Sequence, residues 1–194
     1  MSARIAALGL SLLAFGCVLK HSAPARLYVL QAVVRDPSAA EGVAPQGVLG
    51  VQRVSVPAWM DRPEITARTG TGEIMPDPLA RWGEPITRGI QRVVTENLAA
   101  LLPSHHLVAA PFPAGHPVDH RVDIAITEGG RQPDGRVLLE ARWAILAKDG
   151  AVVVQRRSSF RTGAAPTAEA TVGATSEALG SLCREIAAAL RELS

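Results

Sequence analysis

Two long segments of the chain repeat their apolar residues at the spacing of an amphipathic helix. The first begins near Pro85, which suits a first helical turn because its missing N–H has no partner there, and it ends before Pro103. Arg88 and Arg92 lie on its polar side. Its apolar face consists of Ile86, Ile90, Val93, Val94, Leu98, Leu101 and Leu102. The second helix is predicted over residues 167–193, with an apolar stripe of Val172, Leu179, Leu182, Cys183, Ile186, Leu190 and Leu193.

Residues 136–147 and 151–161 alternate apolar and polar side chains and flank Asp149-Gly150, a strong signal for a two-residue hairpin turn. That turn sets a register with the cross-strand pairs Lys148–Ala151, Ile145–Val154, Trp143–Arg156 and Leu139–Phe160. The same register places polar side chains on the opposite face: Glu140, Arg142, Gln155 and Arg157. One apolar and one polar face are typical of a sheet that is covered on one side.

Further strands are predicted at residues 26–34, 48–56, 106–110 and 122–127, with an irregular hairpin at 64–80. The segments 36–46, 57–63 and 111–117 are rich in turn-forming residues and are predicted loops. Together the elements predict an α+β domain: a mainly antiparallel sheet with two amphipathic helices packed on one face.

The chain has 194 residues, enough for one domain, and 47% of them are hydrophobic, which is sufficient for a substantial core. Its net charge is +2 and falls to +1 if residues 1–16, in which Arg4 is the only charged residue, are removed. So balanced a charge gives no reason to expect nucleic acid as a partner.

The N-terminus has the features of an export signal. Arg4 precedes an apolar run that reaches Gly16 and is shorter than the roughly 20 residues that span a bilayer. A small residue followed by Cys17 is the pattern of a lipoprotein signal peptide, in which the cysteine is acylated, for example with palmitate, and becomes the mature N-terminus. We therefore expect a signal peptide over residues 1–16, a lipidated tether over 17–25 and one periplasmic domain over 26–194. Leucine three residues before the cysteine is usual, whereas this chain has Ala14; an ordinary signal peptide or an uncleaved anchor is the alternative.

Several acyl chains make a stable membrane anchor, whereas one holds a protein only marginally. Val18 follows Cys17, and no aspartate lies beside it, although an aspartate there often marks retention in the inner membrane. The sequence therefore favours the periplasmic face of the outer membrane, with inner-membrane anchoring left open.

Residues that could support catalysis are sparse. The sequence has no G-x-S-x-G or H-E-x-x-H motif, and His105 and His106 are adjacent, so their side chains diverge on a strand. His116 and His120 could chelate a metal only with further ligands, so solvated loop histidines are the favoured interpretation. Cys183 lies on an aliphatic helix stripe and is expected in the core. We expect no metal, no cofactor and no enzymatic activity.

The loop at residues 57–63 is the candidate partner surface. It combines Trp59, Met60, Asp61 and Arg62 between two prolines, and tryptophan and arginine are enriched at binding hot spots. The alternative is internal: Trp59 plugs the core while Asp61 and Arg62 close the turn. Trp143 is expected in the core, on the apolar face of the hairpin.

Four segments together resemble the ABC-type transport auxiliary lipoproteins, the PqiC family. Residues 27–30 read LYVL, 54–65 read VSVPAWMDRPEI, 81–86 read RWGEPI and 92–102 continue as an amphipathic helix containing an N-L pair. In that family the second segment resembles VxxPxYLDRPQI and the third RWAEPL. In this chain Trp59 replaces the tyrosine, Met60 the leucine, Glu64 the glutamine and Gly83 the alanine.

This resemblance implies a non-catalytic subunit of an ABC/MCE-type lipid transport system between the two membranes. The implied partner is an MCE-domain protein, and a homo-oligomeric ring is compatible with the family. Two alternatives remain: an outer-membrane assembly lipoprotein like LptE, which shares a sheet-and-two-helix layout, and an envelope hydrolase. Fold alone does not separate these functions.

Overall fold

Three long antiparallel strands form one side of the sheet: β6 (His120–Arg131), β7 (Arg136–Ala147) and β8 (Val152–Ala164), which is an edge strand. The protein is represented by a computed structural model that describes residues 23–34, 47–113, 115 and 117–193. The predicted pairs Ile145–Val154, Trp143–Arg156 and Leu139–Phe160 are confirmed.

The predicted register is wrong next to the hairpin turn. A bulge after Ile145 shifts the pairing by one residue, so Ala147 rather than Lys148 lies opposite Ala151, and its N–H donates to the Ala151 oxygen at 2.8 Å. The connection is therefore a three-residue loop, and Gly150 takes a positive φ of 89°, as in hairpins that combine a turn with a glycine bulge.

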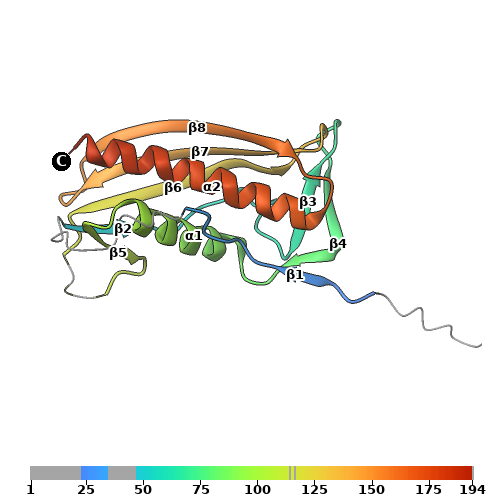
Figure 1. Cartoon of the computed structure of the whole chain (residues 1–194), viewed down its shortest axis with the longest axis horizontal. Helices are drawn as coiled ribbons and strands as arrows, with labels where there is room; N and C mark the ends of the chain where they lie inside the picture. Colours follow the sequence, from blue (N-terminus) through green and yellow to red (C-terminus); the bar gives the residue numbers. More distant parts are fainter. Residues whose placement is uncertain (1–22, 35–46, 114, 116, 194) are drawn as a thin grey trace, which may run out of the picture.

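The second edge of β6 is shared by two smaller groups of strands (Figure 1). At one end it pairs with β2 (Gly47–Val51), which pairs with β5 (His105–Ala109). At the other end it meets β3 (Glu64–Arg68), followed by β4 (Ile74–Trp82) and β1 (Arg26–Tyr28).

The α+β class is confirmed, but the sheet is mixed rather than mainly antiparallel. In the described part of the chain, β1–β4, β2–β5, β2–β6 and β3–β6 are parallel, whereas β3–β4, β6–β7 and β7–β8 are antiparallel. The parallel pairs join strands that are distant in sequence, and no turn motif in the sequence sets their direction.

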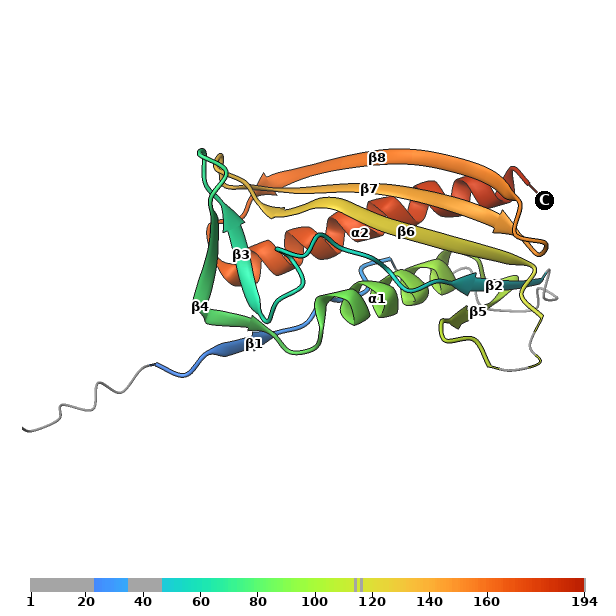
Figure 2. The same cartoon turned by 180° about the vertical axis from the view of Figure 1, so that it is seen from behind.

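Both helices cover the same face of the sheet (Figure 2). They are α1 (Ile86–Leu101) and α2 (Ala168–Arg191), and Thr167 caps α2 by accepting the Ala170 N–H at 3.1 Å. The predicted apolar stripes are confirmed, with one correction. Leu193 lies beyond the end of α2 and is 42% exposed.

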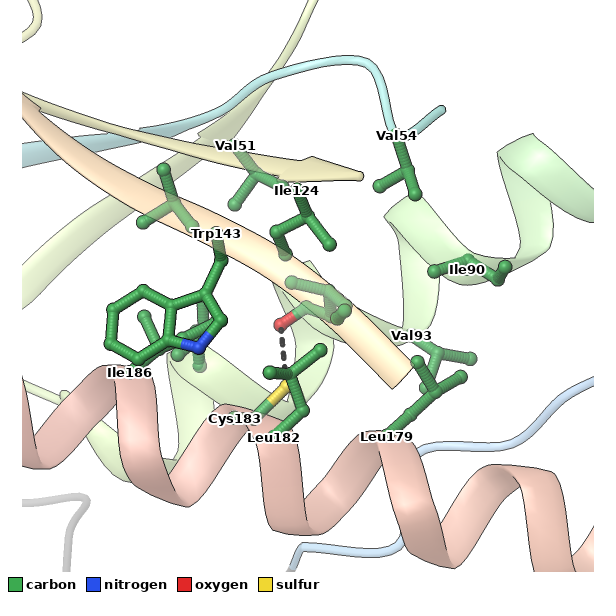
Figure 3. Close-up of a cluster of buried hydrophobic side chains, with 14 of the residues drawn as sticks. Val51, Val54, Ile90, Val93, Ile124, Trp143, Leu179, Leu182, Cys183 and Ile186 are labelled. Atoms are coloured by element: carbon green, nitrogen blue, oxygen red, sulfur yellow. Dashed lines mark hydrogen bonds between the residues drawn. The ribbon is translucent and has the colours of Figure 1, made fainter. Parts of the chain in front are cut away.

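The core lies between the helices and β6–β7 (Figure 3). As expected, Trp143 is buried, and its indole N–H donates to the Ser158 hydroxyl at 2.9 Å. Ser158 in turn donates to the Glu185 carboxylate. The one polar atom of the indole is thereby satisfied, which removes the cost of burying it.

The strand predicted at residues 26–34 is shorter than expected. Pairing ends at Tyr28, and residues 30–34, here called the N-terminal strap, are bonded to helix side chains instead. Asn97 Oδ1 accepts the N–H groups of Val33 and Val34 at 3.1 and 3.0 Å. Side chains of the two helices thus replace the sheet partners that a longer strand would need.

The predicted hairpin at 64–80 and the strand at 106–110 are confirmed as β3–β4 and β5. The strand predicted at 48–56 is confirmed only to Val51. The predicted signal peptide, Cys17, the loop at 36–46 and His116 lie outside the described residues. No helix in the described part of the chain is long and apolar enough to cross a membrane.

Candidate functional site

Two segments that are separated in sequence meet beside the start of α1: the loop at residues 57–63 and the residues 81–86. The Trp82 N–H donates to the Pro63 oxygen at 2.7 Å. Glu64 lies opposite Arg81 in the β3–β4 ladder, and its carboxylate lies 3.6 Å from Arg81 and 3.5 Å from Arg62. We call this meeting point the motif junction, because it unites the two segments on which the family resemblance most depends.

The motif junction borders an open hollow of about 360 Å³. Exposed Asp61 and Arg62 lie on its rim, while Trp82 and buried Ile86 supply apolar lining. Its lining consists of Asp61, Arg62, Pro63, Trp82, Gly83, Glu84, Pro85 and Ile86. This volume is near the lower end of ligand pockets, roughly 300–1,000 Å³, and a polar rim around an apolar floor suits a single inserted side chain.

The four predicted interface residues divide into two inward and two outward side chains. A tight turn, in which the Met60 N–H donates to the Pro57 oxygen at 2.9 Å, positions them. Met60 packs against the core, and a Cβ on Gly129 would come within 2.6 Å of its Cε. Asp61 and Arg62 point to solvent.

Trp59 combines features of both expectations. It is partly buried, and the Arg68 guanidinium lies over its ring at 5.3 Å from the centroid. Arg68 is held by Glu128 at 3.1 Å. The indole is thereby fixed on the surface of the sheet with one part still accessible.

A larger groove of about 720 Å³ runs along the exposed side of α1. Gln91 builds its floor by donating from Nε2 to three backbone oxygens, those of Val51, Gln52 and Ala110, at 3.2, 3.1 and 3.0 Å. Arg53 and Arg88 line it and are exposed. Glu84 lines both this groove and the hollow at the motif junction, so the two concave regions adjoin.

The histidines of the described residues do not form a metal site. His105 is half-buried on β5 and His106 is exposed, so the expected divergence is confirmed. Burial, followed by repulsion from His120, lowers the pKa of His105. Across the described ranges no group of three or more His, Cys, Asp or Glu side chains is placed to hold a metal ion.

Cys183 is fully buried, as its position in the stripe of α2 predicts. Its thiol lies 3.9 Å from the Val94 oxygen of α1, which accepts its hydrogen bond (Figure 3). Burial raises the pKa of this thiol to about 12. A thiol that stays protonated is not a nucleophile, so Cys183 has a packing role.

Two features were not foreseen from the sequence. One is the attachment of the N-terminal strap through Arg92, Asn97 and Ser176. Its signal in the sequence is a polar residue on the buried side of each helix, Asn97 in α1 and Ser176 in α2. The other is the group of exposed apolar side chains on and beside β1 and β4. Leu27 and Val29 fit the alternation of a strand, but the sequence did not show which side of that strand faces solvent.

Comparison with known proteins adds a family and a fold. A family model described as ABC-type transport auxiliary lipoprotein component matches residues 28–187. The crystal structure of an uncharacterised protein aligns with a TM-score of 0.70 at 18% identity, covering 89% of this chain and 100% of that one. A Xanthomonas campestris protein of the family DUF330 aligns with a TM-score of 0.65 at 20% identity, covering 87% of this chain and 100% of that one. No curated protein matches the sequence. At these identities the structural likeness establishes the fold alone.

Proposed function

The chain belongs to the family of ABC-type transport auxiliary lipoprotein components, and on this premise we propose that it is a non-catalytic, lipid-anchored subunit of an MCE-type lipid transport system in the bacterial envelope. The observation that carries this proposal is the family match over residues 28–187, which includes both segments of the motif junction.

The proposed docking site for the MCE-domain protein is the motif junction. Its exposed Asp61 and Arg62 and its apolar floor offer both charge and a pocket to a protein side chain. The network of Glu64, Arg62 and Arg81 fixes the rim before a partner binds, which reduces the entropy lost on binding.

A structural role, rather than catalysis, fits the chemistry of the junction. Its charged groups are engaged with one another: Glu64 contacts two arginines, and Glu84 contacts Arg92 at 2.6 Å. The thiol of Cys183 is protonated and enclosed in the core. A hydrolase would require a nucleophile next to a base in a pocket, and the lining of the hollow offers neither serine, threonine, cysteine nor histidine.

The proposed anchor is acyl chains on Cys17, with the domain on the periplasmic side of the outer membrane. The short apolar run before Cys17 and the absence of an aspartate beside it support this placement. A ring of several copies is compatible with this arrangement.

Site-specific crosslinking tests the docking site. A photoreactive amino acid at Arg62 in the full-length protein, expressed in its native envelope, should crosslink to an MCE-domain protein identified by mass spectrometry. The matched control is Arg157, another exposed arginine, on β8. Crosslinks from Arg62 to a barrel protein instead would favour the assembly-lipoprotein alternative, and equal crosslinking from both positions would contradict docking at the motif junction.

A further inference from the structure

Large exposed apolar side chains gather where the chain enters the domain. In the described part of the chain seven such side chains are exposed, and four of them belong to β1, β4 and the residue after β1. They are Leu27 (70% exposed), Val29 (46%), Met75 (55%) and Leu79 (48%). We call Leu27, Val29 and Leu79 the apolar face. Met75 lies apart from them, in a hollow whose lining includes Ala168 and Thr171 of α2.

The strand register places Leu27 and Leu79 on the same side of the sheet. Leu27 is paired with Arg81, and in a strand every second residue shares a side, so Leu79 faces the same way as Arg81. A register shift between Arg81 and Pro76 interrupts this alternation before Met75 is reached. Tyr28, Trp82 and Ala80 fall on the other side and pack against the core. The apolar face is therefore a continuous outer surface of the β1–β4 pair, and isolated exposed leucines elsewhere do not have this arrangement.

Val29 extends this surface beyond the end of β1. The Gly83 N–H donates to the Tyr28 oxygen at 2.7 Å. If residue 83 carried a Cβ atom, that atom would lie only 3.1 Å from the Cγ1 of Val29. The glycine thus allows the chain after β1 to stay close to β4. As a result Val29 and Leu27 project side by side next to Leu79.

The position of this face along the chain indicates what covers it. Arg26, the first residue of β1, follows Cys17 by nine residues, and nine residues span at most roughly 30 Å when fully extended. The apolar face begins at the next residue, Leu27, so no other surface of the described domain is closer to the anchor in sequence. We propose that the apolar face rests on the membrane surface into which the Cys17 lipid inserts. This inference builds on the proposed function, because it requires that anchor.

The chemistry of the face fits the boundary between lipid headgroups and acyl chains. Leucine and valine can bury there, while exposed Arg81, on the same side as Leu27, can reach lipid phosphates. Contact at this face would orient the domain, with the opposite end of the sheet, at the β7–β8 hairpin, away from the membrane (Figure 1). A second copy of the chain could also cover an apolar face, and the experiment below separates that case.

Fluorescence quenching on vesicles tests the contact. Leu27→Cys and Leu79→Cys are each labelled with an environment-sensitive fluorophore in the acylated full-length protein. The label is then selective, because Cys17 is acylated and the Cys183 thiol is buried with a pKa of about 12. The protein is incorporated into vesicles of phosphatidylethanolamine and phosphatidylglycerol that carry a quencher on their acyl chains. Val152→Cys is the matched control, because the exposure of Val152, 56%, lies between those of Leu79 (48%) and Leu27 (70%), but it lies at the far hairpin.

We expect strong quenching at positions 27 and 79 and little at 152. Vesicle-bound protein with no quenching at 27 and 79, or with equal quenching at all three positions, would overturn the inference while leaving the anchor intact. If the emission of the label at position 79 shifts to the blue as the protein concentration rises, without quenching, a second copy of the chain covers the apolar face. That result also overturns the inference. Failure of the protein to float with vesicles, together with an unmodified Cys17, contradicts the anchor and the inference with it.

Discussion

The Nη2 atom of Arg92 donates a hydrogen bond to the backbone oxygen of Leu30 at 2.8 Å. Leu30 begins the N-terminal strap, and Arg92 belongs to α1, so a helix holds the chain where it enters the domain. Glu84 accepts from the same guanidinium at 2.6 Å and fixes its orientation. Charge-assisted bonds of this kind are among the stronger ones in proteins. The three-residue strand β1 is therefore not the only attachment of the chain that leads toward Cys17.

Asn97→Ala should destabilise the protein by at least about 2 kcal/mol, because it leaves two strap N–H groups without an acceptor and each unsatisfied group costs about 1–3 kcal/mol. Ser176→Ala removes the acceptor of one N–H, that of Gln31, and should cost about 1 kcal/mol. Urea denaturation measures both. An Asn97→Ala effect no larger than that of Ser176→Ala would show that the strap is not held as described.

Leu179→Asp should unfold the domain or destabilise it by more than about 3 kcal/mol, because Leu179 is 0% exposed and the aspartate would have no partner there. Ile186→Asp should act in the same way. Arg88→Ala, on the exposed side of α1, should stay within about 0.5 kcal/mol. Thermal unfolding followed by circular dichroism provides the measurement. Equal loss of stability from the buried and the exposed substitutions would contradict the packing of the helices on the sheet.

Substitutions in the candidate loop should affect either the stability of the domain or the binding of the partner. Met60→Ala should cost about 2 kcal/mol or more, since its side chain fills the space over Gly129. Arg62→Ala should cost less than about 1 kcal/mol, because its pair with Glu64 is exposed, but it should weaken capture of the MCE-type partner. Trp59→Ala should fall between them in stability, as its ring is only partly buried. Full partner capture by Arg62→Ala would rule out its role on the rim.

Stability should decrease as the pH falls through about 6.5, the unfolded value for histidine. The pKa of His105 is lowered in the folded protein by burial and then by His120, so the unfolded chain binds more protons and acid favours unfolding. His105→Gln should reduce this loss, whereas His106→Gln, at an exposed neighbour, should not. Urea midpoints on either side of this pH test it, and an unchanged pH dependence in His105→Gln would contradict the assignment.

The sequence was most informative where structure is local. The 3.6-residue period located both helices, and Asp149-Gly150 gave the pairing of Ile145 with Val154, because a short turn determines the register of the strands beside it. Lys148 is out of the predicted register because a two-residue Asp-Gly turn of type I′ needs a positive φ at both residues, whereas only Gly150 has one.

Contacts between distant segments could not be predicted in the same way. The parallel pairing of β2 with β5 and β6 joins strands about 60–70 residues apart, and no local pattern encodes it. Residues 30–34 have the composition of a strand, yet Asn97 and Ser176 supply their hydrogen bonds. At the candidate site, the composition of the loop did not reveal that Met60 points inward, because that depends on Gly129 of β6. The two segments of the resemblance meet at Pro63 and Trp82, a contact that the sequence alone did not predict.

Mass spectrometry of the mature N-terminus, combined with membrane fractionation, tests the central claim most directly. The account predicts that the protein isolated from its native envelope begins at Cys17, carries acyl chains there and fractionates with membranes, while Cys17→Ala blocks this processing and releases the protein. An unmodified N-terminus together with unchanged membrane association of Cys17→Ala would contradict the claim that this chain is a lipid-anchored transport subunit.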